Sequence, residues 1–220
     1  MSFDLLAPHY RWMEWVLAGS KLQRCRTEFI HAIPAPRQVL MLGEGNGRCL
    51  IELLRAYPLA RFTCVDASRR MLDCARKRIE KHGLSVEKVE FIHADILKWS
   101  PAPQQFDLIV SHFFLDCFER EQIEEIVSRL ALGATAEARW LLADFCEPAA
   151  GLAKWRARLV LKLMYFFFRQ VTRLPASRLT PPDPMLLRNG FTLRERRLAD
   201  WGLLHSDLWV RSGNLKLGQT

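Results

Sequence analysis

The chain has 220 residues, 50% of them hydrophobic and 25% charged, and a formal net charge of +8 at pH 7. This composition excludes a disordered or low-complexity protein, and the length favours one α/β domain with a sizeable core. The basic residues are spread over several segments, so charge alone does not choose between nucleic acid, an anionic membrane and an acidic substrate.

The predicted elements alternate strand and helix along most of the chain. Two short helices are expected within residues 2–31, and Pro34 and Pro36 end them before the first strand. Ser68 is predicted to cap a later helix, which Gly83 closes. Strands are predicted at 39–42, 61–65, 89–93, 106–111, 139–145, 192–198 and 208–211, and further helices at 49–54, 123–130, 151–170 and 181–188.

This alternation implies parallel strands joined by right-handed crossovers, and the last two strands imply a hairpin. We therefore expect an α/β protein with a Rossmann-like three-layer α/β/α sandwich. Its sheet should be mostly parallel and seven-stranded, with a C-terminal antiparallel hairpin.

The first strand ends in a glycine-rich turn, Gly-Glu-Gly-Asn-Gly at 43–47, and a helix is predicted to follow. Glycine lets the chain turn tightly and lets a ligand approach the backbone, and the unpaired amides that open the helix favour a polar or anionic ligand. A dinucleotide fingerprint would need glycine where Arg48 stands, which disfavours an NAD-dependent dehydrogenase. An ordinary tight turn of an α/β domain stays open as the alternative.

Two aspartates follow the next two strands. Asp66 lies 19 residues after Gly47, close to the roughly 20 expected for a carboxylate that binds ribose hydroxyls. Asp95 is placed to accept a hydrogen bond from an adenine amine while Ile96 packs on the ring. Either aspartate alone is more often a turn or capping residue, but at successive strand ends they support each other.

These segments together resemble the class I S-adenosylmethionine-dependent methyltransferases over about residues 37–145. The likeness rests on Val-Leu-Met-Leu-Gly-Glu-Gly-Asn-Gly at 39–47, Val-Asp-Ala-Ser at 65–68, Ala-Asp-Ile at 94–96 and Phe-Asp-Leu-Ile-Val at 106–110. Phe-Asp-Leu-Leu-Ala-Pro-His-Tyr at 3–10 also resembles the opening of the branch that includes the ubiquinone and menaquinone biosynthesis C-methyltransferases.

The resemblance implies S-adenosylmethionine as cofactor and S-adenosylhomocysteine as product. Gly43, Glu44 and Gly45 would line the methionine part, Asp66 would bind the ribose and Asp95 the adenine. The family commonly has an acidic residue where this chain has Met41. The residues implied for the cofactor are Tyr10, Leu42, Gly43, Glu44, Gly45, Gly47, Asp66, Ala67, Ser68, Met71, Asp95, Ile96, Ser111 and His112.

No repeat or linker divides the chain, so one methyltransferase domain is expected over residues 1–220. It comprises an N-terminal helical lid (1–36), a cofactor-binding core (37–145), a helical insert (146–190) and C-terminal strands (191–213).

Methyl transfer asks the protein to hold both partners close together and to remove a proton where the acceptor carries one. His112 faces the methyl group in this fold family and is the candidate base, although a backbone-bonded or cofactor-contacting histidine is an equal alternative. Asp116 is a second catalytic candidate that would orient His112 or a substrate, with capping of the following helix as the alternative. Asp144, at the end of the fifth predicted strand, is a further candidate for a residue in the wall of the site. His9 and His205 have no role assigned.

The helix at 151–170 is basic and aromatic. Lys154, Arg158 and Lys162 repeat every four residues, and the apolar residues Leu152, Trp155, Leu159, Leu163 and Phe166 run opposite them. The helix is too short and too charged to span a bilayer, so residues 152–170 are expected to form an acceptor pocket or to contact an anionic membrane surface. A helix packed on the sheet with a solvated basic face stays open as the alternative.

The predicted function is methyl transfer to oxygen or carbon of a hydrophobic small-molecule or lipid-like acceptor. An RNA or DNA methyltransferase and a non-catalytic S-adenosylmethionine-binding module are the alternatives. Nucleic acid is disfavoured because Ser-His-Phe-Phe at 111–114 replaces the Asn/Asp-Pro-Pro-Tyr/Phe motif that marks many nucleic-acid and protein amide N-methyltransferases.

The cysteines and the N-terminus bear on location. Six cysteines lie far apart without a Cys-x-x-Cys pair, which favours reduced thiols and no metal. Charged residues near the start leave no visible signal peptide. The expected location is cytoplasmic, with the inner face of a membrane as a further option.

Overall fold

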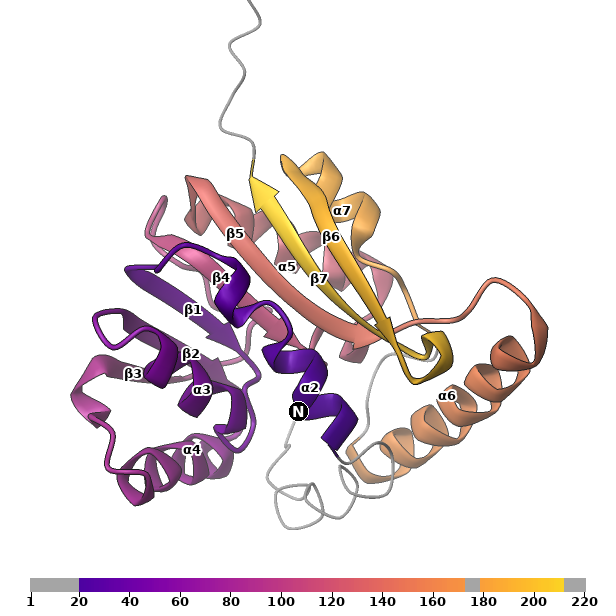
Figure 1. Cartoon of the computed structure of the whole chain (residues 1–220), viewed down its shortest axis with the longest axis horizontal. Coiled ribbons are helices and arrows are strands. Elements are labelled where there is room, and N and C mark those ends of the chain that lie inside the picture. The colour runs from indigo at the N-terminus through magenta and orange to yellow at the C-terminus, as the bar shows by residue number, and fades with distance from the viewer. Residues whose placement is uncertain (1–19, 173–178, 212–220) are drawn as a thin grey trace, which may run out of the picture.

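The computed structural model describes residues 20–172 and 179–211, and in this part of the chain one seven-stranded sheet carries helices on both faces (Figure 1). The strand order is β3-β2-β1-β4-β5-β7-β6. The first five strands are parallel, and β7 runs antiparallel to both β5 and β6. The predicted fold class is confirmed. The strands are β1 (Gln38–Leu42), β2 (Arg61–Asp66), β3 (Val89–His93), β4 (Phe106–His112), β5 (Ala134–Phe145), β6 (Phe191–Ala199) and β7 (Leu204–Arg211).

The helices form two layers. α3 (Arg48–Ala56) and α4 (Arg69–Lys81) pack on one face with α2 (Ser20–Thr27), and α5 (Arg120–Gly133) and α7 (Asp183–Arg188) cover the other. α6 (Gly151–Thr172) packs beside α2 over the end of β5. The short 3-10 turns are η2 (Ile30–Ala32), η3 (Val86–Lys88), η4 (Leu115–Cys117) and η5 (Asp200–Gly202).

β1 shows why the sheet has two cores. Its last four residues are all buried, as expected for a central parallel strand with both faces covered. Successive side chains point to opposite faces, so Val39 and Met41 join the α3 and α4 core while Leu40 and Leu42 join the α5 and α7 core. Met41 therefore lies in the core under the glycine turn.

The predicted ends of α4 are confirmed. The Ser68 side chain accepts a hydrogen bond from the Met71 amide at 3.3 Å and caps the helix. The chain turns out of the helix at Gly83, whose φ of 66° is the left-handed conformation that glycine adopts without strain.

Six strands are longer than the sequence predicted, and β1, β2 and β4 are longer by a single residue. β5 begins at Ala134 instead of Arg139, directly after α5. The prediction missed its first residues because they are mostly small and lack the alternation of a half-buried strand. β6 extends over Phe191–Ala199, and β7 begins at Leu204 instead of Leu208. The missed start of β7 is His-Ser-Asp at 205–207, a polar stretch that pairing with β5 and β6 forces into the sheet.

The expected N-terminal lid is described only in its second half. α2 lies on the sheet face, where Leu22 and Cys25 pack with α6 and β5, and the Ser206 hydroxyl donates a hydrogen bond to the Cys25 carbonyl at 2.9 Å. Residues 1–19, with Tyr10 and His9, lie outside the described residues, so the lid over 1–36 remains a prediction.

α6 buries a different face from the apolar row read in its sequence. Ala157, Leu161, Met164 and Tyr165 pack against the body of the protein. The predicted apolar row is exposed instead, with between 60% and 84% of the surface of each described residue accessible: Leu152, Trp155, Leu159 and Leu163. The side chain of Phe166 lies outside the described part.

Candidate functional site

The carboxyl ends of the parallel strands meet along one edge of the sheet. Leu42 of β1 pairs with Val65 of β2 and with Ser111 of β4, so the glycine turn, Asp66 and His112 follow neighbouring positions. Asp66 in turn pairs with His93, two residues before Asp95. The predicted cofactor residues of the described chain are thus brought to the edge where ligands bind in open α/β sheets.

The glycine turn is wound in the left-handed conformation, with φ of 58° at Gly43, 66° at Gly45 and 79° at Gly47. L-residues adopt such angles only with strain, so glycine is required by the backbone itself. A Cβ on Gly43 would lie 2.3 Å from a ring atom of Phe114, which shows how closely the segment after β4 approaches the turn.

The expectation that the first amides of α3 await an anionic ligand is wrong. The Glu44 carboxylate accepts hydrogen bonds from the amides of Cys49 at 2.7 Å and Leu50 at 3.0 Å. The chain therefore caps this helix with its own anion, which suits the positive end of the helix dipole. A cationic group, such as the ammonium of an amino acid, fits beside the turn better than a phosphate.

Asp66 and Asp95 have the same local structure. Oδ1 of Asp66 accepts from the Ser68 amide at 2.8 Å, and Oδ1 of Asp95 accepts from the Leu97 amide at 3.0 Å. Each carboxylate is thus fixed by an Asx turn at the end of its strand. A role in the turn and a role in cofactor binding are compatible, because a carboxylate has further lone pairs for hydroxyl or amine donors.

Apolar residues close to these aspartates in the sequence are buried. Met71 and Ile96 are buried, and Asp95 is exposed. Nε2 of His93 lies 3.1 Å from the carbonyl oxygen of Ala67, so this histidine connects the two strand ends. The exposed carboxylate of Asp95 is a hydrogen-bond acceptor that a ligand can reach.

Ser111 is turned into the protein. Its hydroxyl accepts a hydrogen bond from the indole N–H of Trp140 at 2.7 Å, and only 1% of its surface is exposed. The side chain therefore joins β4 to β5, and only the backbone of Ser111 is left for a cofactor.

His112 is buried on the side of α2. Burial, and next the positive charge of Arg26, lower its pKa to about 3. Arg26 is itself buried and lies with its guanidinium 5.2 Å from the centre of the Phe113 ring. His112 is therefore neutral near pH 7, and its Nδ1 atom has no hydrogen-bond partner within the described residues. These surroundings favour a neutral contact over a strong base.

Asp116 does not cap α5. That helix is capped by Glu119 in a capping box with Gln122, whose side chain accepts from the Glu119 amide at 3.1 Å. Asp116 instead lies buried in η4, where burial raises the pKa of its carboxyl to about 6.

The Asp116 carboxyl faces Asp144 at the end of β5. Burial and then the charge of Asp116 raise the pKa of Asp144 well above its ordinary value. The two carboxyls therefore titrate as a pair. Tyr165 of α6 donates a hydrogen bond to the Asp116 carbonyl at 3.2 Å and closes this corner.

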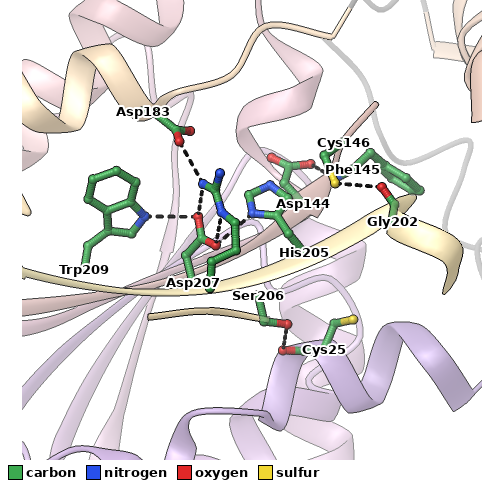
Figure 2. Close-up of polar contacts among 11 residues, drawn as sticks. Cys25, Asp144, Phe145, Cys146, Asp183, Gly202, His205, Ser206, Asp207 and Trp209 are labelled. Carbon is green, nitrogen blue, oxygen red and sulfur yellow. Dashed lines mark hydrogen bonds and ion pairs between the residues drawn. The ribbon is translucent and has the colours of Figure 1, made fainter. Parts of the chain in front are cut away.

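Asp144 also lines a cavity of about 780 Å³ between α6, the segment 179–184 and the ends of β5 and β7. His205 lies on the same wall, as the cross-strand partner of Asp144. Figure 2 shows the His205 ring between the carboxyls of Asp144 and Asp207. No role was assigned to His205 or Asp207 from the sequence, because their alternation on one strand face is visible only once β7 is known to begin at Leu204.

The residues present fit S-adenosylmethionine. The glycines allow the left-handed turn, Glu44 supplies a negative charge within it, and Asp66 and Asp95 supply acceptors at successive strand ends. The acidic residue that the resemblance leads one to expect at Met41 is absent, and Met41 is fully buried in the core. Glu44, within the turn itself, is the carboxylate that lies closest to Met41 in the sequence.

Residues 39–133 match the family model described as a methyltransferase domain. A malonyl-[acyl-carrier protein] O-methyltransferase from Halalkalibacterium halodurans is 35% identical over 80 residues, which are 35% of this chain and 28% of that protein. The ubiquinone/menaquinone biosynthesis C-methyltransferase UbiE of Desulfotalea psychrophila is 36% identical over 84 residues, 37% of this chain and 34% of that one. The chain thus spans about a third or less of the length of these relatives.

Solved structures share the fold over nearly the whole chain. The mitomycin 7-O-methyltransferase MmcR superposes with a TM-score of 0.69 at 17% identity, covering 96% of this chain and 61% of that one. The magnesium protoporphyrin IX methyltransferase ChlM from Synechocystis, solved with bound SAH, gives 0.62 at 17% identity, covering 88% and 82%. With the strand-end motifs, the sheet order and the family match in agreement, residues 39–133 are similar to a methyltransferase domain, and the described chain has the fold of the class I S-adenosylmethionine-dependent methyltransferases.

Proposed function

We propose that the protein is an enzyme that transfers the methyl group of S-adenosylmethionine to oxygen or carbon of a hydrophobic small-molecule or lipid-like acceptor. The observation that carries this proposal is the position of the cavity. It lies at the end of β5, on the strand-end edge that also holds the glycine turn and Asp66. Phe145, Leu161 and Leu179 give it apolar walls, which suits an apolar acceptor.

When bound, the cofactor supplies an electrophilic methyl group on a sulfonium. The chain's residues then hold the adenosine at Asp66 and Asp95, place the acceptor beside the end of β4, and exclude water. Tyr10 is proposed to close over the amino-acid end of the cofactor. Asp116 and Asp144 are proposed to orient groups at the junction between the two ligands.

An RNA or DNA acceptor is the second candidate, and the net charge of +8 is what favours it. A third candidate is a module that binds the cofactor without transferring its methyl group, which the loss of an acidic residue at Met41 favours. The proposal for a small acceptor rests instead on the cavity and on the sequence Ser-His-Phe-Phe at 111–114.

Isothermal titration calorimetry should show that S-adenosylmethionine binds the full chain and that Asp66→Asn weakens this binding about 10- to 100-fold. The asparagine keeps the hydrogen bond to the Ser68 amide but lacks the charge that strengthens bonds to the ribose hydroxyls, a loss of about 1.5–3 kcal/mol. Asp73→Asn, on the exposed side of α4, is the matched control and should bind normally. If Asp66→Asn bound S-adenosylmethionine as tightly as the wild type, the proposed cofactor site at Asp66 would be wrong.

The acceptor class is tested with tritiated cofactor. Incubation with total lipid and small-molecule extracts, and separately with RNA, should label the organic-soluble fraction. Label confined to RNA would make the second candidate correct, and cofactor binding without label in either fraction would support the third.

We also propose that α6 contacts an anionic membrane surface. Leu152, Trp155 and Leu159 are exposed along one side of the helix, and Trp201 at the tip of the β6–β7 hairpin is 73% exposed beside Arg156. Basic side chains of α6 flank this surface, which is the pattern of helices that lie in the membrane interface. Within the described residues, no helix combines the length and low charge that crossing a bilayer requires. A cytoplasmic location is part of this proposal.

Vesicle flotation measures this contact. The protein should float with vesicles of phosphatidylcholine and phosphatidylglycerol, and Trp155→Glu with Leu159→Glu should lower the bound fraction at least tenfold, because each side chain contributes about 1.5–3 kcal/mol when it leaves water. The pair Leu59→Glu and Leu132→Glu changes two exposed leucines elsewhere and should bind as the wild type. Equal loss in both pairs, or no flotation of the wild type, would contradict a membrane contact through α6.

A further inference from the structure

The wall of the cavity at β5 and β7 carries buried polar groups that the cofactor site does not use. His205 and Asp144 are neighbours across the two strands, and each has less than 5% of its surface exposed. Nδ1 of His205 lies 3.0 Å from Oδ1 of Asp207 but makes no well-aligned hydrogen bond, so the ring is held by a close contact with the carboxylate.

Asp207 is fixed from three directions. Arg196 of β6 forms a fork on it, with Nε 2.7 Å from Oδ1 and Nη2 2.6 Å from Oδ2. The indole of Trp209 donates to Oδ2 at 3.2 Å, and Arg196 also donates to Asp183 of α7 at 2.8 Å (Figure 2). Burial acts to raise the pKa of Asp207, but the hydrogen bonds from Arg196 and the contact with His205 together hold it below its usual value.

Stability alone is a weak explanation for this arrangement. A buried ion pair is often no more stabilising than apolar residues of the same volume, since both charges must leave water. A histidine held by a carboxylate on one nitrogen, with its ring on the wall of a cavity, is the arrangement in which a histidine takes up a proton from a ligand.

The remaining walls define the ligand. Phe145, Leu161, Leu179 and the prolines at 181, 182 and 184 are apolar. At the rim, Arg158 and Lys162 of α6 face a single carboxylate, Glu147, which Arg158 contacts at 2.8 Å. Lys154 also approaches Glu147 at 3.8 Å, and Arg196 on the same lining is paired with Asp183 at 2.8 Å. Among the described residues Lys162 has no ion-pair partner, so it is the rim cation left for an anionic group. A volume of about 780 Å³ lies within the roughly 300–1,000 Å³ of small-molecule sites.

We propose that this cavity binds the methyl acceptor, an apolar hydroxylated compound that carries an anionic group, and that His205 takes the proton of its hydroxyl group. Asp207 is the positioning residue that fixes the ring. This inference rests on the proposed function and adds to it the acceptor site, the acceptor class and the base.

The atoms and electrons of the methyl transfer balance among the acceptor, the cofactor and the His205 side chain. The acceptor O–H bond breaks and its proton moves to the imidazole, while the oxygen forms a bond to the methyl carbon. The S–C bond breaks with its electron pair left on sulfur, which gives neutral S-adenosylhomocysteine. Asp207 compensates the positive charge that forms on the imidazolium. His112 lacks such a partner, since the charge that it faces is the cation Arg26.

The site is tested without knowledge of the natural acceptor by using 6-hydroxy-2-naphthoate as the probe. It has an apolar body, a hydroxyl and a carboxylate, whereas 2-naphthol lacks the carboxylate and 2-naphthoate lacks the hydroxyl. In the full chain labelled with ¹⁵N at histidine, the probe should shift the ring resonances of His205, identified by their loss in His205→Gln, and leave those of His31 at the far edge of the sheet unchanged. Arg158→Gln with Lys162→Gln should weaken the probe about tenfold and leave 2-naphthol unaffected.

Methyl transfer to the same probe separates the roles. His205→Gln should lower the rate at least 100-fold, the usual range for loss of a general base, with S-adenosylmethionine binding unchanged. Asp207→Asn should lower kcat while KM stays near the wild-type value, since the ring loses its orientation and not its contact with the probe. His31→Gln is the matched control and should behave as the wild type.

Each other outcome overturns the inference. A probe that shifts no histidine ring resonance of the wild type removes the acceptor site, even if His205→Gln fails to fold. A rate lost in His112→Gln but kept in His205→Gln assigns the base to His112. Either result leaves the proposed function intact if S-adenosylmethionine still binds. Failure of that binding would overturn the proposed function instead.

Discussion

Gly47→Ala is expected to lower the free energy of unfolding by about 2–4 kcal/mol. The new Cβ would lie 2.8 Å from Cα and 3.0 Å from Cβ of Ala75, which belong to α4 and cannot move without shifting that helix. Overpacking of this kind costs about 1–3 kcal/mol, and the left-handed φ of 79° adds about 1 kcal/mol for an L-residue. Urea unfolding monitored by circular dichroism measures the change.

Gly83→Ala is the control that isolates the backbone contribution. Gly83 has a similar φ of 66°, but an added Cβ would meet no atom within 4 Å. Its loss of stability should therefore be about 1 kcal/mol. Equal losses at the two glycines would mean that α4 yields at Ala75 and that the close packing of the turn is unimportant.

Asp116→Asn is expected to stabilise the protein at pH 8 by about 3 kcal/mol and to have little effect at pH 4. Burial raises the pKa of this carboxyl from 3.8 to about 6 in the folded state. The folded protein therefore holds its proton over a range in which the unfolded chain has released it, so stability falls as pH rises from about 4 to 6. A difference of about two pKa units corresponds to about 3 kcal/mol. Asparagine is uncharged and avoids this cost.

The measurement is urea unfolding of wild type and variant at pH 4, 6 and 8, and the quantity of interest is their difference. Carboxyls that do not interact with Asp116 cancel in that difference, among them Asp200, whose pKa is shifted in the opposite direction, downward. The pKa of Asp144 falls when the charge of Asp116 is removed, which adds to the stabilisation at pH 8. Asp73→Asn, at an exposed position, should track the wild type at every pH. If Asp116→Asn also tracks it, Asp116 is ionised in the folded protein and does not share a proton with Asp144.

The sequence by itself determined the cofactor half of this protein, because its signals are local. A glycine turn with three left-handed residues, a capping serine and two aspartates in Asx turns each depend on neighbours within about five positions. Apolar periodicity predicted the alternation of strands and helices, and together these predicted the fold class and where Asp66 and Asp95 lie. Even here one local expectation failed, because the amides at the start of α3 are taken by Glu44.

Only the tertiary structure decided the other half, because its groups meet through pairing between distant strands. The start of β7 is polar and does not resemble a strand until β5 and β6 pair with it, and only then do His205 and Asp207 share a face with Asp144. Likewise, the sequence of α6 offers two apolar rows, and only contact with β5 and α2 selects the one at Leu161 for burial and leaves Trp155 in solvent. Periodicity specifies that a face is apolar, whereas its partner is set by elements far away in the chain.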